Sequence, residues 1–145
     1  MGRLLAIDYG EKRVGLAVSD YGQVIATKLT TVSTLEIFPF LEDYMKREEV
    51  DLIVVGNPKQ MDNTPSEIAN TVKVFVDNLS NTFTDMDIYM IDERYTSKMA
   101  SKIIAQSGMK KKKRQEKGLV DTIAAVLILQ DFMKMYQGGI QMNHL

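Results

Sequence analysis

Three carboxylate side chains stand at points of the sequence where α/β enzymes place their chemistry. Asp8 closes the short apolar run Leu4–Ile7, and Glu93 follows the apolar run 87–91. Asp121 lies in the first turn of the last predicted helix. If the two runs form parallel strands that lie near one another, their acids share one edge of a sheet, where the ligands of such sheets gather. Clustered carboxylates repel one another unless a cation neutralises them, so the pattern predicts a divalent metal site.

Each acid also has a purely structural interpretation. Asp8 precedes a Tyr-Gly pair and suits a turn, and Glu93 can pair with its neighbour Arg94. Asp121 can favour the positive end of a helix dipole. Three weaker rivals for the same edge are Asp20, Asp62 and Asp92. The prediction of a site therefore depends on convergence of the acids and not on any one of them.

The composition restricts the chemistry that such a site can perform. Cysteine is absent, and the single histidine, His144, lies close to the C-terminus. Thiolate catalysis, disulfides, thiolate zinc sites and a Ser-His-Asp triad within one chain are thereby excluded. Oxygen ligands remain, and these favour Mg²⁺ or Mn²⁺, ions that activate water for phosphodiester hydrolysis.

Positive charge is concentrated in one short segment. The formal net charge is -1, yet six basic residues fall within residues 110–117, opposed only by Glu116. They are Lys110, Lys111, Lys112, Lys113, Arg114 and Lys117. Such a run is either a solvated loop or a contact to the phosphate backbone of a nucleic acid. Arg13 and Arg94 lie near the predicted edge and could clamp phosphates there, or form surface ion pairs.

The elements that must position these residues follow a mixed α/β pattern. Three β-rich runs separated by tight turns predict antiparallel strands over 4–8, 14–19 and 24–32. The continuous apolar run 52–56 is typical of a buried parallel strand, and residues 87–91 predict a fifth strand. Helical patterns lie around 40–45, over 64–79, from Thr96 or Ser97 to Gly108, and over 118–136. The order predicts a five-stranded mixed sheet, three antiparallel strands followed by parallel βαβ strands, with helices on both faces.

The chain of 145 residues is the length of one domain. We expect this domain to cover residues 1–136, followed by a flexible C-terminal tail over 137–145. No run approaches the ~20 apolar residues of a membrane span, and no signal-peptide pattern opens the chain, so we expect a cytoplasmic protein that contacts no membrane.

Four blocks of the sequence, spread in order over residues 3–136, resemble the YqgF family. They are Ala6–Asp20 (AIDYGEKRVGLAVSD), Val54–Pro58 (VVGNP), Asp92–Ser97 (DERYTS), and Lys117–Ala125 (KGLVDTIAA) with Leu127–Gln130 (LILQ). The resemblance implies a ribonuclease H-like fold and a metal-dependent nuclease, and the residues that match the family's acidic positions are Asp8, Glu93 and Asp121. One departure is Asn63-Thr64-Pro65, where the family often has glycine after the Met-Asp pair.

The family is described both as the nuclease that completes the 5′ end of 16S ribosomal RNA and as a Holliday junction resolvase. The resemblance therefore implies structured RNA, the 16S precursor or a pre-ribosomal particle, as partner. The alternative within the same chemistry is branched DNA in recombination and repair. A four-way junction favours a homodimer, whereas RNA cleavage allows a monomer.

Two hypotheses of other classes stay open. The basic segment could serve a non-catalytic module that binds ribosomal RNA. The Asp8 hairpin also resembles the phosphate loop of actin-like and sugar-kinase ATPases, but these usually need a second copy of the domain, for which 145 residues leave no room.

Overall fold

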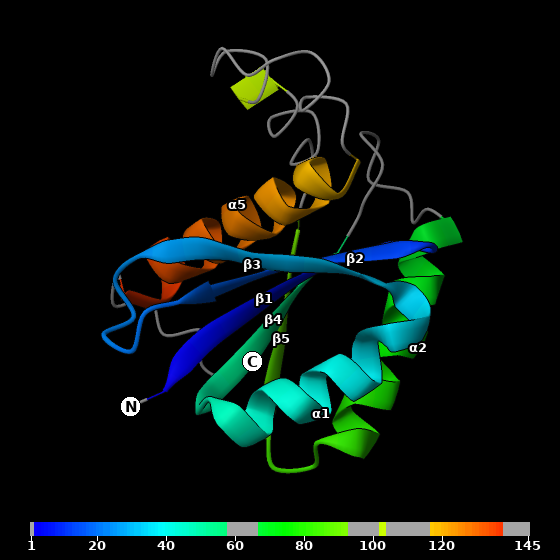
Figure 1. The fold of residues 1–145 in the computed structure, drawn as a ribbon, viewed down its shortest axis with the longest axis horizontal. Helices are drawn as coiled ribbons and strands as arrows, with labels where there is room; N and C mark the ends of the chain where they lie inside the picture. The colour runs from blue at the N-terminus through cyan, green and yellow to red at the C-terminus, as the bar shows by residue number, and fades with distance from the viewer. Residues whose placement is uncertain (1, 58–66, 93–101, 104–116, 138–145) are drawn as a thin grey trace.

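The computed structural model describes residues 2–57, 67–92, 102–103 and 117–137 (Figure 1). The strands are β1 (Arg3–Tyr9), β2 (Arg13–Ser19), β3 (Ala26–Ser33), β4 (Val50–Asn57) and β5 (Asp87–Asp92). The helices are η1 (Thr34–Glu36, a 3₁₀ turn), α1 (Ile37–Arg47), α2 (Glu67–Thr82) and α5 (Lys117–Gln137).

The five strands form one sheet in the order β3-β2-β1-β4-β5. β1 pairs antiparallel with β2, which pairs antiparallel with β3, and β1 pairs parallel with β4, which pairs parallel with β5. This arrangement confirms the predicted mixed sheet. It also makes β1 the central strand, so that the residues at its end lie in the middle of the sheet edge.

Alternate side chains of β1 enter two different cores. Leu5 and Ile7 belong to the core under α1 and α2, whereas Leu4 and Ala6 belong to the core under α5. All four are completely buried. Figure 1 shows α1 and α2 on one side of the sheet and α5 on the other. The helices therefore cover both faces, as predicted, and every even-numbered position of β1 points toward α5.

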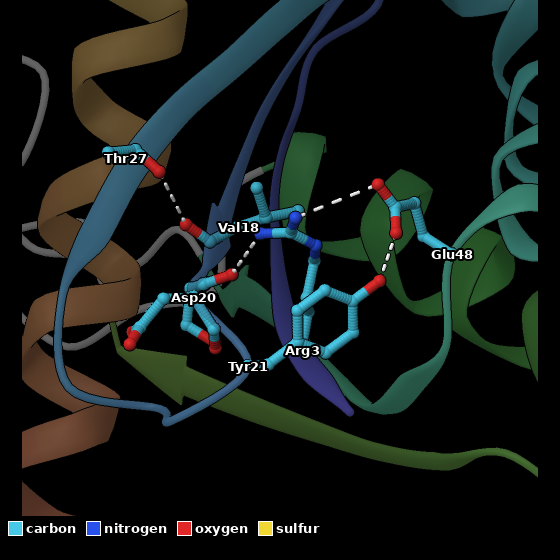
Figure 2. Close-up of polar contacts among 7 residues, drawn as sticks. Arg3, Val18, Asp20, Tyr21, Thr27 and Glu48 are labelled. Atoms are coloured by element: carbon cyan, nitrogen blue, oxygen red, sulfur yellow. Dashed lines mark hydrogen bonds and ion pairs between the residues drawn. The ribbon is translucent and has the colours of Figure 1, made fainter. Parts of the chain in front are cut away.

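The N-terminal end of β1 is fixed by a polar cluster around Arg3 (Figure 2). The Arg3 guanidinium donates to the Ser19 main-chain oxygen at 2.9 Å and forms an ion pair with Glu48 at 3.6 Å. It also lies 4.4 Å from the centre of the Tyr21 ring, and the Tyr21 hydroxyl donates to Glu48. These contacts attach the β2–β3 turn to the start of β1 and to the residue that follows α1.

The third strand begins later than the sequence predicts, at Ala26 and not at Val24. The reason is the side chain of Asp20, whose Oδ1 accepts from the main-chain N–H groups of Val24 and Ile25 at 2.8 and 2.9 Å. Those N–H groups are thereby held in a turn and do not enter the ladder. Asp20 thus has a structural role at the end of the sheet away from Asp8.

The first long helix begins at Ile37, after a 3₁₀ turn that the Ser33 hydroxyl caps by accepting from the Leu35 N–H at 3.3 Å. Pro39 consequently falls in the first turn of α1, where proline is tolerated. Of the helix predicted to end near Gly108, residues 102–103 are described and are helical. None of the helices in the described ranges is long and apolar enough to cross a membrane. Residues 138–145 of the predicted tail lie outside the described residues.

Candidate active site

Asp8 lies near the C-terminal end of the central strand, on the face of the sheet that α5 covers. Leu4 and Ala6 pack under α5, and Asp8 continues the same alternation one step further along β1. Unlike those two residues, Asp8 is partly exposed. The apolar strand thus delivers a carboxylate to the point where the core under α5 opens.

The neighbour of Asp8 on β2 is Gly15, its direct antiparallel partner. A Cβ atom built on Gly15 would lie 2.1 Å from the main-chain oxygen of Asp121 and 3.0 Å from the Asp121 Cβ. No larger residue fits there, so glycine allows the main chain of α5 to touch β2. The start of α5 is therefore fixed directly above the strand that neighbours Asp8.

This close approach sets the distance between the two acids. Opposed residues of an antiparallel pair carry their Cβ atoms on one face, about 4.5–5.5 Å apart. Because the Cβ position at Gly15 is 3.0 Å from the Asp121 Cβ, the Cβ atoms of Asp8 and Asp121 lie within about 8.5 Å of each other. Two carboxylates at this separation can reach a common cation. The structure thus brings together two of the three predicted acids, which are separated by more than 100 residues in sequence.

Asp121 is not in the first turn of its helix, contrary to the prediction. α5 begins at Lys117, and its first turn contains no acid. The favourable interaction with a helix dipole falls off within that first turn, so the dipole does not explain this carboxylate. Instead the Asp121 Oδ2 accepts from Arg13 Nε at 2.8 Å, with the two side chains 22% and 39% exposed.

A second contact holds the start of α5 on the sheet. Thr31 of β3 is the partner of Gly15 in the other ladder, and its hydroxyl bonds to the hydroxyl of Thr122 at 2.5 Å. Thr122 is buried. The residue after Asp121 is thus bonded to the edge strand, which limits rotation and sliding of α5 beside Asp8.

Glycine also flanks Asp8 on its other side. β1 and β4 run in parallel register, with Ile7 opposite Val55, and Gly56 follows Val55 as Asp8 follows Ile7. Asp8 therefore stands between Gly15 and Gly56, two positions without side chains. Because these two positions carry no side chain, another main chain or a ligand can approach the Asp8 carboxylate closely.

Several contacts hold the turn between β1 and β2. Gly10 is essential to it, since a Cβ there would lie 2.6 Å from the main-chain oxygen of Arg13. Thr34 attaches the turn to η1, because its hydroxyl donates to the Gly10 oxygen at 2.7 Å and its N–H donates to the Lys12 oxygen at 3.0 Å. The Tyr9 ring stacks on Phe75 of α2 with centroids 4.2 Å apart, and burial raises the pKa of the Tyr9 hydroxyl. These contacts fix the segment that presents both Asp8 and Arg13.

Of the other predicted site residues, the structure describes only some. Glu93, Arg94, Lys110, Lys111, Lys112, Lys113 and Arg114 lie outside the described residues, as does the rival acid Asp62. Lys117 is the first residue of α5, and the rival Asp92 is the last of β5. Within the described ranges no three acidic or histidine side chains form a metal-binding group. Arg13, predicted to contact nucleic acid, is found on Asp121.

Sequence reasoning passed over Gly15, although a signal for it was present. A glycine inside the β-rich run 14–19 indicates a bulge or the close approach of another main chain. The partner of Arg13 had no comparable signal, because nothing in a local pattern specifies a contact across 108 residues.

Comparisons with known proteins identify the family and the fold of this chain. A family model, RuvX, described as Holliday junction resolvase, matches residues 2–135. A relative from Parabacteroides distasonis is 50% identical over 139 residues, covering 94% of this chain and 99% of its own. Another from Flavobacterium johnsoniae is 49% identical over 133 residues, covering 92% and 96%. Both carry the name "Putative pre-16S rRNA nuclease".

Solved structures of similar fold include two of RuvC from Thermus thermophilus. One, in complex with a Holliday junction substrate, has a TM-score of 0.56 and 15% identity, covering 97% of this chain and 98% of that one. The other has a TM-score of 0.52 and 15% identity, covering 94% and 96%. At this identity the likeness concerns the fold, and it confirms the predicted ribonuclease H-like architecture.

Proposed function

This chain belongs to the RuvX family, the same family as YqgF, and on that premise we propose that it is a metal-dependent nuclease that matures the 5′ end of precursor 16S ribosomal RNA. The observation that carries the proposal is the contact of β2 with α5 at Gly15, because it places Asp121 beside Asp8. The two curated relatives described above, with about half of their residues identical, supply the choice of substrate.

The donor set suits a hard divalent cation. Asp8 and Asp121 offer carboxylate oxygens on the same face of the sheet. Oxygen-only ligands fit Mg²⁺ or Mn²⁺, which keep several waters and bind substrate phosphates as well. When bound, such an ion lowers the pKa of water and stabilises the charge that develops on the phosphodiester oxygens.

We assign the third ligand to Glu93. Tyr89 and Ile91 of β5 pack in the core under α5, so their side chains share a face with Asp8. The assignment follows the family's acidic positions, and Glu93 comes two residues after Ile91 in the sequence.

The basic residues would hold the sugar–phosphate backbone. Arg94 follows the third acid directly, and the segment 110–114 together with Lys117 leads into the helix that carries Asp121. Cations beside an acidic metal site neutralise the substrate phosphates that the acids repel. Arg13, next to Asp121, would do the same for the scissile region.

Cleavage assays test this function directly. Precursor 16S RNA is incubated with the wild type, Asp8→Asn and Asp121→Asn in Mg²⁺ or Mn²⁺, with Asp131→Asn as matched control, since Asp131 is an exposed acid further along α5. Loss of a metal ligand should lower cleavage by on the order of 100-fold or more. The control should cleave like the wild type, and equal cleavage by all four proteins would reject the assignment.

The second candidate function is resolution of four-way DNA junctions, favoured by the description of the family model. The same four proteins should be offered a junction in parallel with the RNA. Preferential, Asp8-dependent cleavage of the junction would make DNA the substrate. Binding of RNA without cleavage of either substrate would favour a non-catalytic module.

A further inference from the structure

Arg13 forms an ion pair with Asp121, one of the two described acids of the candidate site. It shares the α5 face of β2 with Gly15, two residues further along, and its Nε donates to Asp121 Oδ2 at 2.8 Å. A guanidinium therefore lies against a carboxylate that, under the proposed function, binds a divalent cation. The two cations compete for the same oxygen.

The way Arg13 is held differs from that of the other partly buried arginine, Arg3. Arg3 is fixed by the Ser19 main-chain oxygen and, as Figure 2 shows, by Glu48 and the Tyr21 ring. In the described part of the chain Arg13 has a single ion pair, to Asp121, and its side chain is 39% exposed. Arg3 is built into the fold, whereas Arg13 can leave Asp121 without breaking another ion pair to a described residue.

We propose that Arg13 is a displaceable counter-ion, which neutralises Asp121 until a divalent cation takes its place. The proposal rests on the proposed function, because it needs a cation at Asp121. Without the ion, the carboxylates of Asp8 and Asp121, whose Cβ atoms lie within about 8.5 Å of each other, repel one another, and the guanidinium lowers this repulsion. With the ion bound, the guanidinium is a like charge beside a doubly charged centre, and it moves away from the carboxylate.

The displaced guanidinium has a new partner in the substrate. Its planar fork of donors matches a phosphate, and its exposed position lets it reach one in solvent. In the metal-free protein Arg13 neutralises Asp121, and in the metal-bound protein it contacts a phosphate of the substrate. Because only a bound metal displaces Arg13 from Asp121, the positive charge of Arg13 becomes available to the substrate only when the metal is present.

Mn²⁺ binding tests the competition in protein free of nucleic acid. The concentration of free Mn²⁺ is measured by electron paramagnetic resonance during titration of the wild type, Arg13→Gln, Arg13→Lys and Asp121→Asn. Removal of the positive charge in Arg13→Gln should tighten Mn²⁺ binding by about tenfold, because charges this close repel even through water-like screening. Arg13→Lys keeps the charge and should bind Mn²⁺ as the wild type does.

Arg47→Gln is the matched control. Arg47 also donates its Nε to an aspartate, Asp43, at 3.1 Å, but on the exposed side of α1. The substitution changes the net charge equally and should leave Mn²⁺ affinity unchanged. A tightening by Arg47→Gln equal to that by Arg13→Gln would overturn the proposal, since the effect would then be one of overall charge.

The Mn²⁺ affinities of Asp121→Asn and Arg13→Gln separate failure of the displacement from failure of the proposed metal site. If Asp121→Asn binds Mn²⁺ as tightly as the wild type, Asp121 is not a ligand and both fail. If Asp121→Asn loses binding but Arg13→Gln binds with unchanged or weaker affinity, the metal site stands and the displacement is wrong. Tighter Mn²⁺ binding in Arg13→Gln, together with wild-type Mn²⁺ affinity in Arg13→Lys and Arg47→Gln, supports displacement.

The Nε–H resonances of the arginines give a second readout. Titration with Mg²⁺ should shift the Arg13 Nε signal, identified by its loss in Arg13→Gln, as the bond to Asp121 breaks. The signals of Arg3 and Arg47 should stay in place. An Arg13 signal that stays in place at saturating Mg²⁺ would overturn the proposal.

Discussion

The substitution Gly15→Ala tests the contact that brings the two acids together. The added methyl group would lie 2.1 Å from the main-chain oxygen of Asp121, whereas ordinary contact begins at 3.4 Å. Either β2 or the start of α5 must therefore move by about 1.3 Å. The two atoms nearest to the added methyl group, the carbonyl oxygen and carbon of Asp121, belong to the main chain, so no side-chain rotation can relieve the clash.

The expected cost follows from this displacement. Overpacking of a tight contact lowers the free energy of unfolding by about 1–3 kcal/mol. A shift of 1 Å between catalytic groups can lower activity by on the order of 100-fold. Urea unfolding measures the first effect, and cleavage of precursor RNA at a temperature where the variant is folded measures the second.

Gly22→Ala is the control for this experiment. Gly22 lies in the exposed β2–β3 turn, where the nearest atom to an added Cβ is a carboxylate oxygen of Asp20 at 3.1 Å, the movable end of a side chain. We expect a change in stability of at most about 0.5 kcal/mol and unchanged cleavage. A Gly15→Ala protein with the stability and activity of the control would refute the arrangement of Asp8 and Asp121 described here.

Three further predictions concern stability. Main-chain hydrogen bonds from Ile25 and Val24 lower the pKa of Asp20 from its usual 3.8, so the ionised carboxylate stabilises the fold above that pH and the contribution is lost as the pH falls through the lower, folded-state value. Asp20→Asn should therefore flatten the acid limb of the stability curve, measured by urea unfolding at several pH values, and an unchanged limb would contradict the turn described for Asp20. Phe132→Ala removes a completely buried ring of the core under α5 and should lower the free energy of unfolding by about 3–5 kcal/mol, measured in urea; a loss below about 1 kcal/mol would mean that α5 is not packed as described. Mg²⁺ at 100 times its dissociation constant should stabilise the wild type by about 2.7 kcal/mol in thermal unfolding, and equal stabilisation of Asp8→Asn would exclude Asp8 as a ligand.

The sheet could be predicted from the sequence because each strand carries its own local signal. The two tight turns within residues 4–32 predict antiparallel neighbours, and the continuous apolar run at 52–56 predicts a buried parallel strand, as β4 is. The start of β3 was misjudged because the capture of two N–H groups by Asp20 is a matter of side-chain geometry. The position of Asp121 within α5 was misjudged by less than one turn, since nothing sharp in the sequence marks where the helix begins.

The candidate site could be predicted only in outline. Asp8 is identifiable as an acid that ends an apolar strand, and the structure places it as expected at the sheet edge. That Asp121 lies beside it depends on one glycine, and that Arg13 pairs with Asp121 depends on the packing of a helix against a hairpin. Such contacts arise from tertiary packing, which local periodicity does not encode. The role of Glu93 stays a prediction.

Anomalous diffraction from a crystal soaked in Mn²⁺ tests most directly whether these distant acids share one cation. We predict an anomalous peak within bonding distance of carboxylate oxygens from both Asp8 and Asp121, with Arg13 turned away from Asp121. A peak bound to neither acid, or no peak at saturating Mn²⁺ with Asp8 and Asp121 fully ordered, would contradict it.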